Sequence, residues 1–247
     1  MVGGRRVCAA TTVAAAFFVW SCVSAGTARA DADESRRIVF SGRDVWRHSV
    51  FAHGGLLLAP GGFAQDGLML KLLLSTGAYR YHAQNLGRAV TGYEGKAQLL
   101  PGWRIKRGNA EMKFFFGPEF QYHYLSPDDP DNRLRGRSFG LRVATELWYE
   151  PTRTTLVAGD ASLTSIGASH SVRLALGMLV FGEMIDALYV GPETQVFGAD
   201  GYRQIRFGAH ITSMKTAETE WSAGIGWAHD SDGRSSPYLR ISVMARR

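Results

Sequence analysis

Residues 112–124 read MKFFFGPEFQYHY, and their side chains alternate between an apolar and a polar series. One series contains only Met, Phe, Pro and Tyr, whereas the other carries Lys113, Glu119 and His123. Because successive side chains of a β-strand point to opposite faces of a sheet, this period of two predicts a strand with one apolar and one polar face. The segment exceeds the ~5–6 residues of a typical strand and the ~9–11 with which a tilted strand crosses a bilayer.

The same alternation continues along the chain, with short Gly, Pro, Asn and Asp punctuation between segments. It predicts twelve strands, near residues 38–46, 49–60, 66–82, 90–106, 110–125, 136–150, 154–166, 169–181, 186–198, 202–214, 219–230 and 235–246. Ten strands is the alternative, if the first hairpin around residues 46–48 does not form. Pro118 and Pro192 fall inside two of these strands, where each removes a backbone donor and predicts a bulge or a local break.

Two folds bury or expose such strands differently. A soluble β-sandwich packs its apolar faces together, whereas an outer-membrane barrel exposes them to lipid and lines its interior with polar groups. Within nine of the twelve segments, the central stretch of the apolar series contains no charged residue, as at 68–74, 139–149 and 205–211. The charged face is rich in glycine, as a crowded interior requires, at Gly117, Gly140, Gly177, Gly208 and Gly224. The pattern therefore favours the barrel.

Aromatic side chains also lie near strand ends on the apolar face, as they do in the interfacial girdles of membrane barrels. These residues are Trp103, Tyr122, Tyr124, Tyr149, Trp221 and Trp227. We predict an all-β fold, a closed antiparallel up-and-down transmembrane β-barrel in the outer membrane. A soluble periplasmic β-sandwich that binds a partner or a sugar is the alternative.

Residues 1–30 resemble a secretory signal peptide. Arg5 and Arg6 precede an apolar segment too short to span the ~30 Å of hydrocarbon in a bilayer. Small residues follow it, and we predict cleavage between Ala30 and Asp31.

The remaining residues, 31–247, are predicted to form one barrel domain. Its net charge falls from +6 to +3, because three arginines lie in the signal peptide. Both cysteines lie in that peptide too, and lipidation at Cys22 is an alternative to simple cleavage. A modest charge on an exported chain argues against nucleic-acid binding. Outer-membrane lipid and lipopolysaccharide are the expected surroundings and partners.

The segments between strands predict an orientation. The connections at 81–90, 125–135 and 229–236 are predicted to face outward, and the one at 125–135 is predicted to be long. The tight turns at 107–109 and 150–153 then face the periplasm, as do both termini of the barrel.

Several short motifs resemble one protein family. Residues 117–121 (GPEFQ) recur as 191–195 (GPETQ), alongside FSGRDV at 40–45, LSPDDP at 125–130 and GYRQIRFG at 201–208. With these motifs the chain resembles the cellulose biosynthesis protein BcsS family over roughly residues 39–243. The resemblance implies a Gram-negative outer-membrane barrel that is accessory to the biosynthesis or export of the exopolysaccharide cellulose. Components of the export machinery, or the glucan itself, are the implied partners, and the family offers no catalytic residues to carry over.

Charged residues of the polar series are candidate lumen-lining residues. They are Glu94, Lys96, Lys113, Glu119, Arg142, Glu146, Arg173, Glu193, Arg206 and Arg240. With cations this numerous, ion pairs that fill the interior are simpler than a glycosidase pair formed by Glu119 and Glu193. Inward-facing Phe115, Trp148 and Tyr189 would narrow the lumen further, which favours a scaffolding role over a glucan conduit.

A hydrolase or acyltransferase acting on lipid or glycan is the enzymatic alternative. Its nearest candidates are Asp160, Ser162, His170 and Ser171, but adjacent strand residues such as His170 and Ser171 point to opposite faces. The oxygen-rich segment at 128–132 could hold Ca²⁺ or bridge lipopolysaccharide through a cation, yet Asp, Asn and Pro are also ordinary turn residues, and we expect a plain exposed loop. We therefore predict no enzyme activity, no cofactor and no metal.

Overall fold

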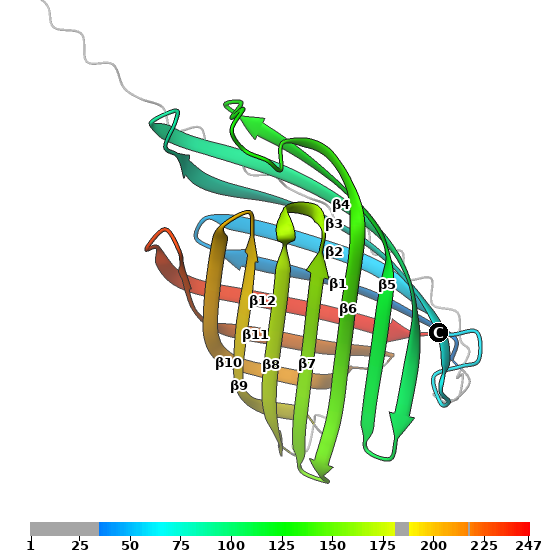
Figure 1. The fold of residues 1–247 in the computed structure, drawn as a ribbon. Coiled ribbons are helices and arrows are strands. Elements are labelled where there is room, and N and C mark those ends of the chain that lie inside the picture. The colour runs from blue at the N-terminus through cyan, green and yellow to red at the C-terminus, as the bar shows by residue number, and fades with distance from the viewer. Residues whose placement is uncertain (1–34, 181–187, 217) are drawn as a thin grey trace, which may run out of the picture.

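The computed structural model describes residues 35–180, 188–216 and 218–247. Within them the chain forms twelve antiparallel strands, each paired with its sequence neighbours, and β1 pairs with β12 to close the sheet (Figure 1). The strands are β1 (Arg37–Trp46), β2 (Ser49–Leu58), β3 (Gly67–Ala83), β4 (Arg88–Arg107), β5 (Ala110–Ser126), β6 (Gly136–Thr152), β7 (Thr155–Thr164), β8 (His170–Val180), β9 (Leu188–Ala199), β10 (Tyr202–Thr216), β11 (Thr219–Asp230) and β12 (Ser235–Arg246).

The predicted closed barrel of twelve strands is confirmed. The first hairpin is formed, with β1 and β2 paired from Arg37 opposite Leu58 to Trp46 opposite Ser49, so the ten-strand alternative is wrong. The described strand ends lie within two residues of the predicted ones.

Four sequence predictions lie outside the described residues. The signal peptide at 1–30 and the cleavage point between Ala30 and Asp31 fall in this group. So do the possible lipid attachment at Cys22 and the predicted strand ends at 181 and 186. Among the residues that are described, no helix is both long enough and apolar enough to cross a membrane.

Strand β1 begins and strand β12 ends at the same end of the barrel. We call the opposite end, which carries the connections that follow β1, β3, β5, β7, β9 and β11, the outer end. Two of the three connections predicted to face outward are short, at 84–87 and 231–234. The third spans 127–135 and is the long one. A 3₁₀ turn, η1 (Ile166–Ala168), joins β7 to β8 at the same end, where Gly167 has a positive φ of 58°.

The wall of the barrel is uneven in height. Strands β3 to β6 are 17–20 residues long, whereas the other strands are 10–15 residues long. The β3–β4 and β5–β6 hairpins extend past the rest of the wall at the outer end (Figure 1). We call this part, residues 79–92 and 122–138, the outer projection.

The two faces of the wall differ as the alternation requires. The outward face exposes large apolar side chains, among them Phe139, Phe207 and Met178, and the six aromatic residues predicted for the girdles are also exposed. The inward face carries the charged series described below. Several arginines near the ends of strands depart from this division, since Arg80, Arg137 and Arg203 are exposed in the outward series. Arg43 of β1 is a further one, exposed between outward-facing Ser41 and Val45. It lies three residues from the outer end of β1, where a long cationic side chain can reach the headgroup region.

Pro118 and Pro192 each lie where strand pairing is interrupted without a shift of register, and Pro101 of β4 falls in the same gap as Pro118. The β4–β5 ladder stops between the Gln98–Glu119 and Gly102–Phe115 pairs, across from Pro118. The β8–β9 ladder stops in the same way beside Pro192 and then resumes. The missing proline N–H accounts for these local breaks, one of the two outcomes expected.

Candidate functional site

The interior of the barrel is lined by ion pairs. A repeated motif, GPExQ at residues 117–121 and 191–195, supplies Glu119 to a pair with Arg142 and Glu193 to a pair with Arg173. In each copy of the motif, the glutamine side chain donates to the glutamate two residues before it. Gln121 Nε2 lies 2.6 Å from Glu119 Oε1, and Gln195 Nε2 lies 3.0 Å from Glu193 Oε1. Residues two apart on a strand face the same side, so the spacing Glu-x-Gln places both polar groups in the lumen.

The glycine that opens each copy is also needed there. A Cβ at Gly191 would overlap the backbone carbonyl of Leu176 on β8, at the place where the ladder is interrupted. Glycine therefore allows the close approach of the two strands beside the proline break.

Glu193 is the most heavily bonded carboxylate of the interior. Its side chain has no exposed surface, and it accepts hydrogen bonds from four groups on three strands. Arg173 Nε on β8 lies 3.0 Å from Oε2, and Arg240 Nη2 on β12 lies 2.7 Å from the same oxygen. Tyr238 Oη and Gln195 Nε2 each lie 3.0 Å from Oε1. The side chain crosses the inner face of β11 at Gly224, where a Cβ would overlap Oε1.

A second set of charges lines the opposite part of the wall. Glu146 on β6 binds Lys71 on β3 at 2.5 Å and Lys113 on β5 at 3.2 Å. Lys113 also lies 3.1 Å from Glu111, which in turn binds Arg104 at 2.6 Å. These alternating charges form a continuous chain from β3 to β6, and each charge is compensated by a neighbour.

Arg206 joins the two ends of the sheet. Its guanidinium on β10 binds the Asp44 carboxylate on β1 at 2.6 and 2.9 Å. The guanidinium is 4.7 Å from the ring centre of Phe197 and 4.9 Å from that of Tyr238. Its Nε donates to Gln204 Oε1 at 2.7 Å, so this almost fully buried cation is satisfied on every side.

The remaining predicted residues belong to a polar chain along the inner wall. Arg142 donates to Glu119 at 3.2 Å and to Ser162 Oγ at 2.6 Å, and Ser162 Oγ lies 2.8 Å from Ser171 Oγ. Lys96 binds Glu94 at 2.8 Å. The ten candidate residues thus share the inner face, but they form several local clusters instead of one center.

Several interior charges among the described residues are absent from the ten candidates, including Asp44, Lys71 and Glu111. Lys71 alternates with the outward-facing leucines around it, and Glu111 is two residues before Lys113, so register alone could have identified both. Asp44 was hidden because adjacent Arg43 places a charge on the outward face and blurs the alternation of β1.

The candidate hydrolase residues are not assembled into a triad. Ser162 and Ser171 face the lumen and contact each other, whereas His170 is exposed on the outward side, where its Nδ1 lies 3.2 Å from the Ala168 carbonyl oxygen. Asp160 lies 3.6 Å from Arg173. Among the described residues, no group of three or more His, Cys, Asp or Glu side chains is placed to hold a metal ion.

The oxygen-rich segment at 128–132 holds the two hairpins of the outer projection together through hydrogen bonds. Asp129 accepts hydrogen bonds from Tyr81 Oη at 2.7 Å and from Asn85 Nδ2 at 3.0 Å, which ties the β5–β6 loop to the β3–β4 hairpin. Asp128 pairs with Arg135 through two hydrogen bonds of 2.6 and 2.7 Å. The plain exposed loop expected from the composition is wrong at Asp129, which is buried because these donors surround it.

The stability of this loop is expected to depend on pH through Asp129. The hydrogen bond from Tyr81 holds the pKa of the Asp129 carboxyl below its usual value of ~3.9. A lowered folded-state pKa stabilises the folded loop above that usual value, and the stabilisation is lost as the pH falls through the folded pKa. Hydrogen exchange at 127–135, corrected for the intrinsic rate, should show constant protection down to about pH 4 and less below it.

The Asp129→Asn variant is the control for this prediction. Its loop should be less protected at neutral pH and should show no further loss below about pH 4. An acid-induced loss of the same size in the variant would contradict the role assigned to Asp129.

The closed sheet, the apolar outward face and the ion-paired interior define an outer-membrane β-barrel. The fold is similar to an outer membrane channel from Pseudomonas putida F1, with a TM-score of 0.53 and 13% identity over 90% of this chain and 100% of that chain. It is also similar to the translocator domain of the autotransporter NalP from Neisseria meningitidis, with a TM-score of 0.50 and 10% identity over 86% and 88% of the two chains. At these identities the likeness concerns the fold alone.

The family is shown by the sequence. The profile described as cellulose biosynthesis protein BcsS matches residues 38–247, and the chain belongs to that family. This confirms the resemblance in the short motifs. A search among curated proteins found no match.

A charge placed on the lipid-facing side should destabilise the barrel. Phe207 on β10 is 66% exposed on the outward face, so Phe207→Arg is expected to lower the free energy of unfolding by up to ~2–4 kcal/mol, the cost near the bilayer midplane. Urea unfolding in lipid vesicles measures it. Phe207→Leu should lie close to wild type, and equal stability of the Arg and Leu variants would show that this face does not touch lipid.

Proposed function

We propose that this chain is a non-catalytic accessory barrel of cellulose biosynthesis, a rigid outer-membrane component rather than a conduit for the glucan. The observation that carries the proposal is the mutual saturation of the interior charges. Glu119 and Glu193 are buried, and each already accepts hydrogen bonds from an arginine and a glutamine. A catalytic acid or base must exchange a proton with its substrate, and carboxylates held in this way are poorly suited to it.

The number of strands and the inward side chains support a structural role, because both limit the width of the lumen. Barrels of about eight strands are filled by side chains, whereas those of about sixteen to eighteen leave an aqueous channel. In this barrel of twelve strands, Phe115, Tyr189 and Tyr238 point inward and are buried. The pairs Glu146–Lys71, Arg206–Asp44 and Glu193–Arg240 each join strands that are three positions apart in the sheet, so their side chains reach over the intervening wall.

The outer projection is the part we propose for contact with the cellulose export machinery. It extends beyond the rest of the wall (Figure 1) and is fixed by the Asp129 hydrogen bonds. Buried Ala83, Val90 and Leu125 pack together within it. A surface that is already ordered loses little conformational entropy when a partner binds, which suits a docking element.

Complementation of a strain that lacks the gene tests this function. Ser162→Ala and Ser171→Ala should each restore wild-type cellulose output, because neither hydroxyl is proposed to do chemistry. A variant in which a short Gly-Ser turn replaces residues 127–135 should fold, as judged by its mobility on unboiled gels, and yet lose output. Loss of output in a folded serine variant would contradict the non-catalytic role, and full output with the shortened projection would contradict the docking role.

A further inference from the structure

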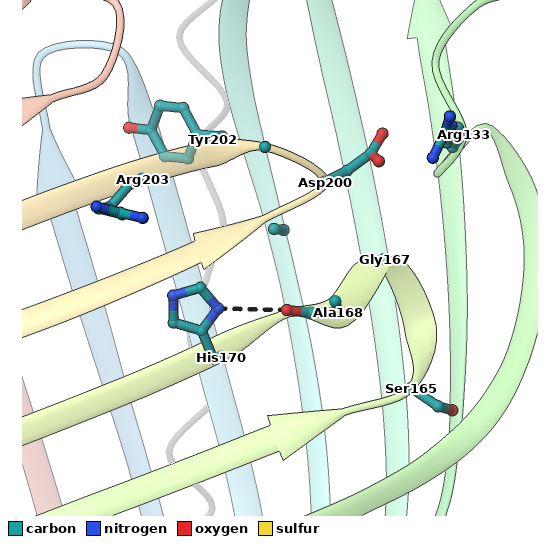
Figure 2. Close-up of a pocket in the computed structure, with 10 residues that line it drawn as sticks. Arg133, Ser165, Gly167, Ala168, His170, Asp200, Tyr202 and Arg203 are labelled. Carbon is teal, nitrogen blue, oxygen red and sulfur yellow. Dashed lines mark hydrogen bonds between the residues drawn. The ribbon is translucent and has the colours of Figure 1, made fainter.

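Beside the barrel wall, the outer end carries a cavity that the interior network does not use. Its volume is about 590 Å³, and it lies between the β5–β6 loop, η1 and the β9–β10 turn. Figure 2 shows its polar lining, which includes Arg133, His170, Asp200 and Arg203. A second cavity of about 370 Å³ shares Arg203 and adds Ile205, His229 and neighbouring loop residues.

Arg203 and His170, two strand residues of this lining, face outward, away from the lumen. Arg203 and Ile205 are exposed on the outward side of β10, and Gln204 between them is buried inside. The His170 ring lies over Gly198 of β9, and its Nδ1 donates to the Ala168 carbonyl oxygen at 3.2 Å (Figure 2). Arg133 reaches the cavity from the β5–β6 loop.

These cations also differ from those of the interior in being unpaired. Lys71, Arg173, Arg206 and Arg240 all bind carboxylates within the lumen. Within the described ranges, no carboxylate lies within ion-pairing distance of the guanidinium of Arg133 or Arg203. The cavity does contain one acidic side chain, Asp200, whose backbone N–H donates to the Gly167 carbonyl at 2.8 Å.

Directly beneath the cations lies the apolar band of the outward face. Val172 on β8 and Phe207 on β10 are exposed there, at 51% and 66%, and Ile205 lines the second cavity itself. The surface thus joins guanidinium groups at the rim to an apolar wall that faces lipid tails. This is the arrangement that a phosphorylated lipid matches, because guanidinium binds phosphate oxygens through paired hydrogen bonds and acyl chains pack on apolar surface.

We propose that this cavity binds the phosphorylated headgroup of a saccharolipid of the outer leaflet, of the lipopolysaccharide type. Arg133 and Arg203 lie on opposite sides of the cavity (Figure 2), so each offers its guanidinium to a different part of the phosphorylated headgroup, and the acyl chains lie along β8 and β10. The site would fix the barrel to the lipid that surrounds it and would set its height in the membrane. It is independent of the proposed role in cellulose biosynthesis.

A titration of the folded protein in detergent with purified diphosphorylated lipid A, followed by native mass spectrometry, tests the proposal. The wild type should bind, and Arg133→Gln/Arg203→Gln should bind at least ~10-fold more weakly, since glutamine cannot supply the charge-assisted hydrogen bonds of guanidinium to phosphate. The matched control is Arg80→Gln, which removes an exposed arginine of β3 outside both cavities. It should bind like wild type, and gel mobility should show all three proteins folded.

Three further arms separate the sources of the phosphate. Dephosphorylated lipid A should bind at least ~10-fold more weakly, equal concentrations of inorganic phosphate should not displace the lipid, and EDTA should leave binding unchanged. The proposal is overturned if the double variant binds like wild type, if Arg80→Gln weakens binding equally, or if the dephosphorylated lipid binds as well. Displacement by inorganic phosphate would indicate a free-anion site instead, and loss in EDTA would indicate a cation bridge through Asp200.

Discussion

The Glu193→Gln variant is expected to lose about 3–5 kcal/mol of unfolding free energy, the typical cost of removing one partner from a buried ion pair. The glutamate carboxylate is the common acceptor for Arg173 and Arg240, so its neutralisation leaves two cations without their charge partner. Arg240 is affected more, because its Nε already lacks a hydrogen-bond partner in the structure. Urea unfolding in lipid vesicles, followed on unboiled gels, measures the loss.

Two companion variants sharpen this prediction. Asp160→Asn removes the same charge from the same lumen, but the Asp160 side chain is 47% exposed and its pair with Arg173 is 3.6 Å long. It should cost less than about 1 kcal/mol. The double variant Glu193→Gln/Arg240→Gln should recover part of the stability, since the unpaired cation is removed as well. Equal stability of Glu193→Gln and wild type would refute the assigned role of the carboxylate.

The Arg206→Met variant is expected to cost a similar ~3–5 kcal/mol. It removes the two hydrogen bonds to Asp44 and the contact of the cation with the Phe197 and Tyr238 rings. Methionine fills most of the volume, so the loss reports the charge and its bonds more than a cavity. Because Arg206 links β10 to β1, the variant should also open more easily near the closing β1–β12 seam, which hydrogen exchange can detect.

Arg203→Met is the matched control on the same strand. Its guanidinium faces outward and makes no ion pair within the described part of the chain, so its replacement should change stability by less than about 0.5 kcal/mol. Arg206→Lys should fall between wild type and Arg206→Met, because an ammonium group cannot reproduce the two parallel bonds to Asp44. Equal losses of stability in Arg203→Met and Arg206→Met would contradict the stabilising role assigned to the buried pair of Arg206 with Asp44.

Alternation was sufficient to predict the barrel, because a strand of period two leaves only two choices for its faces. Residues 112–124 show this most clearly, and the structure places their apolar series outside and their polar series inside. The repeated GPExQ motif similarly indicated two equivalent strands. Its proline predicted the interruption of pairing, and the spacing of Glu and Gln determined that both face the lumen.

Partners across the sheet could not be predicted, because they depend on register between distant strands. Asp44 and Arg206 are 162 positions apart in the sequence and meet only when the sheet closes. The burial of Asp129 likewise requires Tyr81 and Asn85 from another hairpin. The cavity with Arg133 and Arg203 is formed by three separate connections, none of which carries a local motif for phosphate.

The lumen itself is most directly examined by single-channel recording with the purified barrel in a planar bilayer. Closure by paired side chains predicts no large, regular current steps, and added cello-oligosaccharides should leave the trace unchanged. Large regular steps that cello-oligosaccharides block would instead show an open glucan pathway and contradict a structural interior.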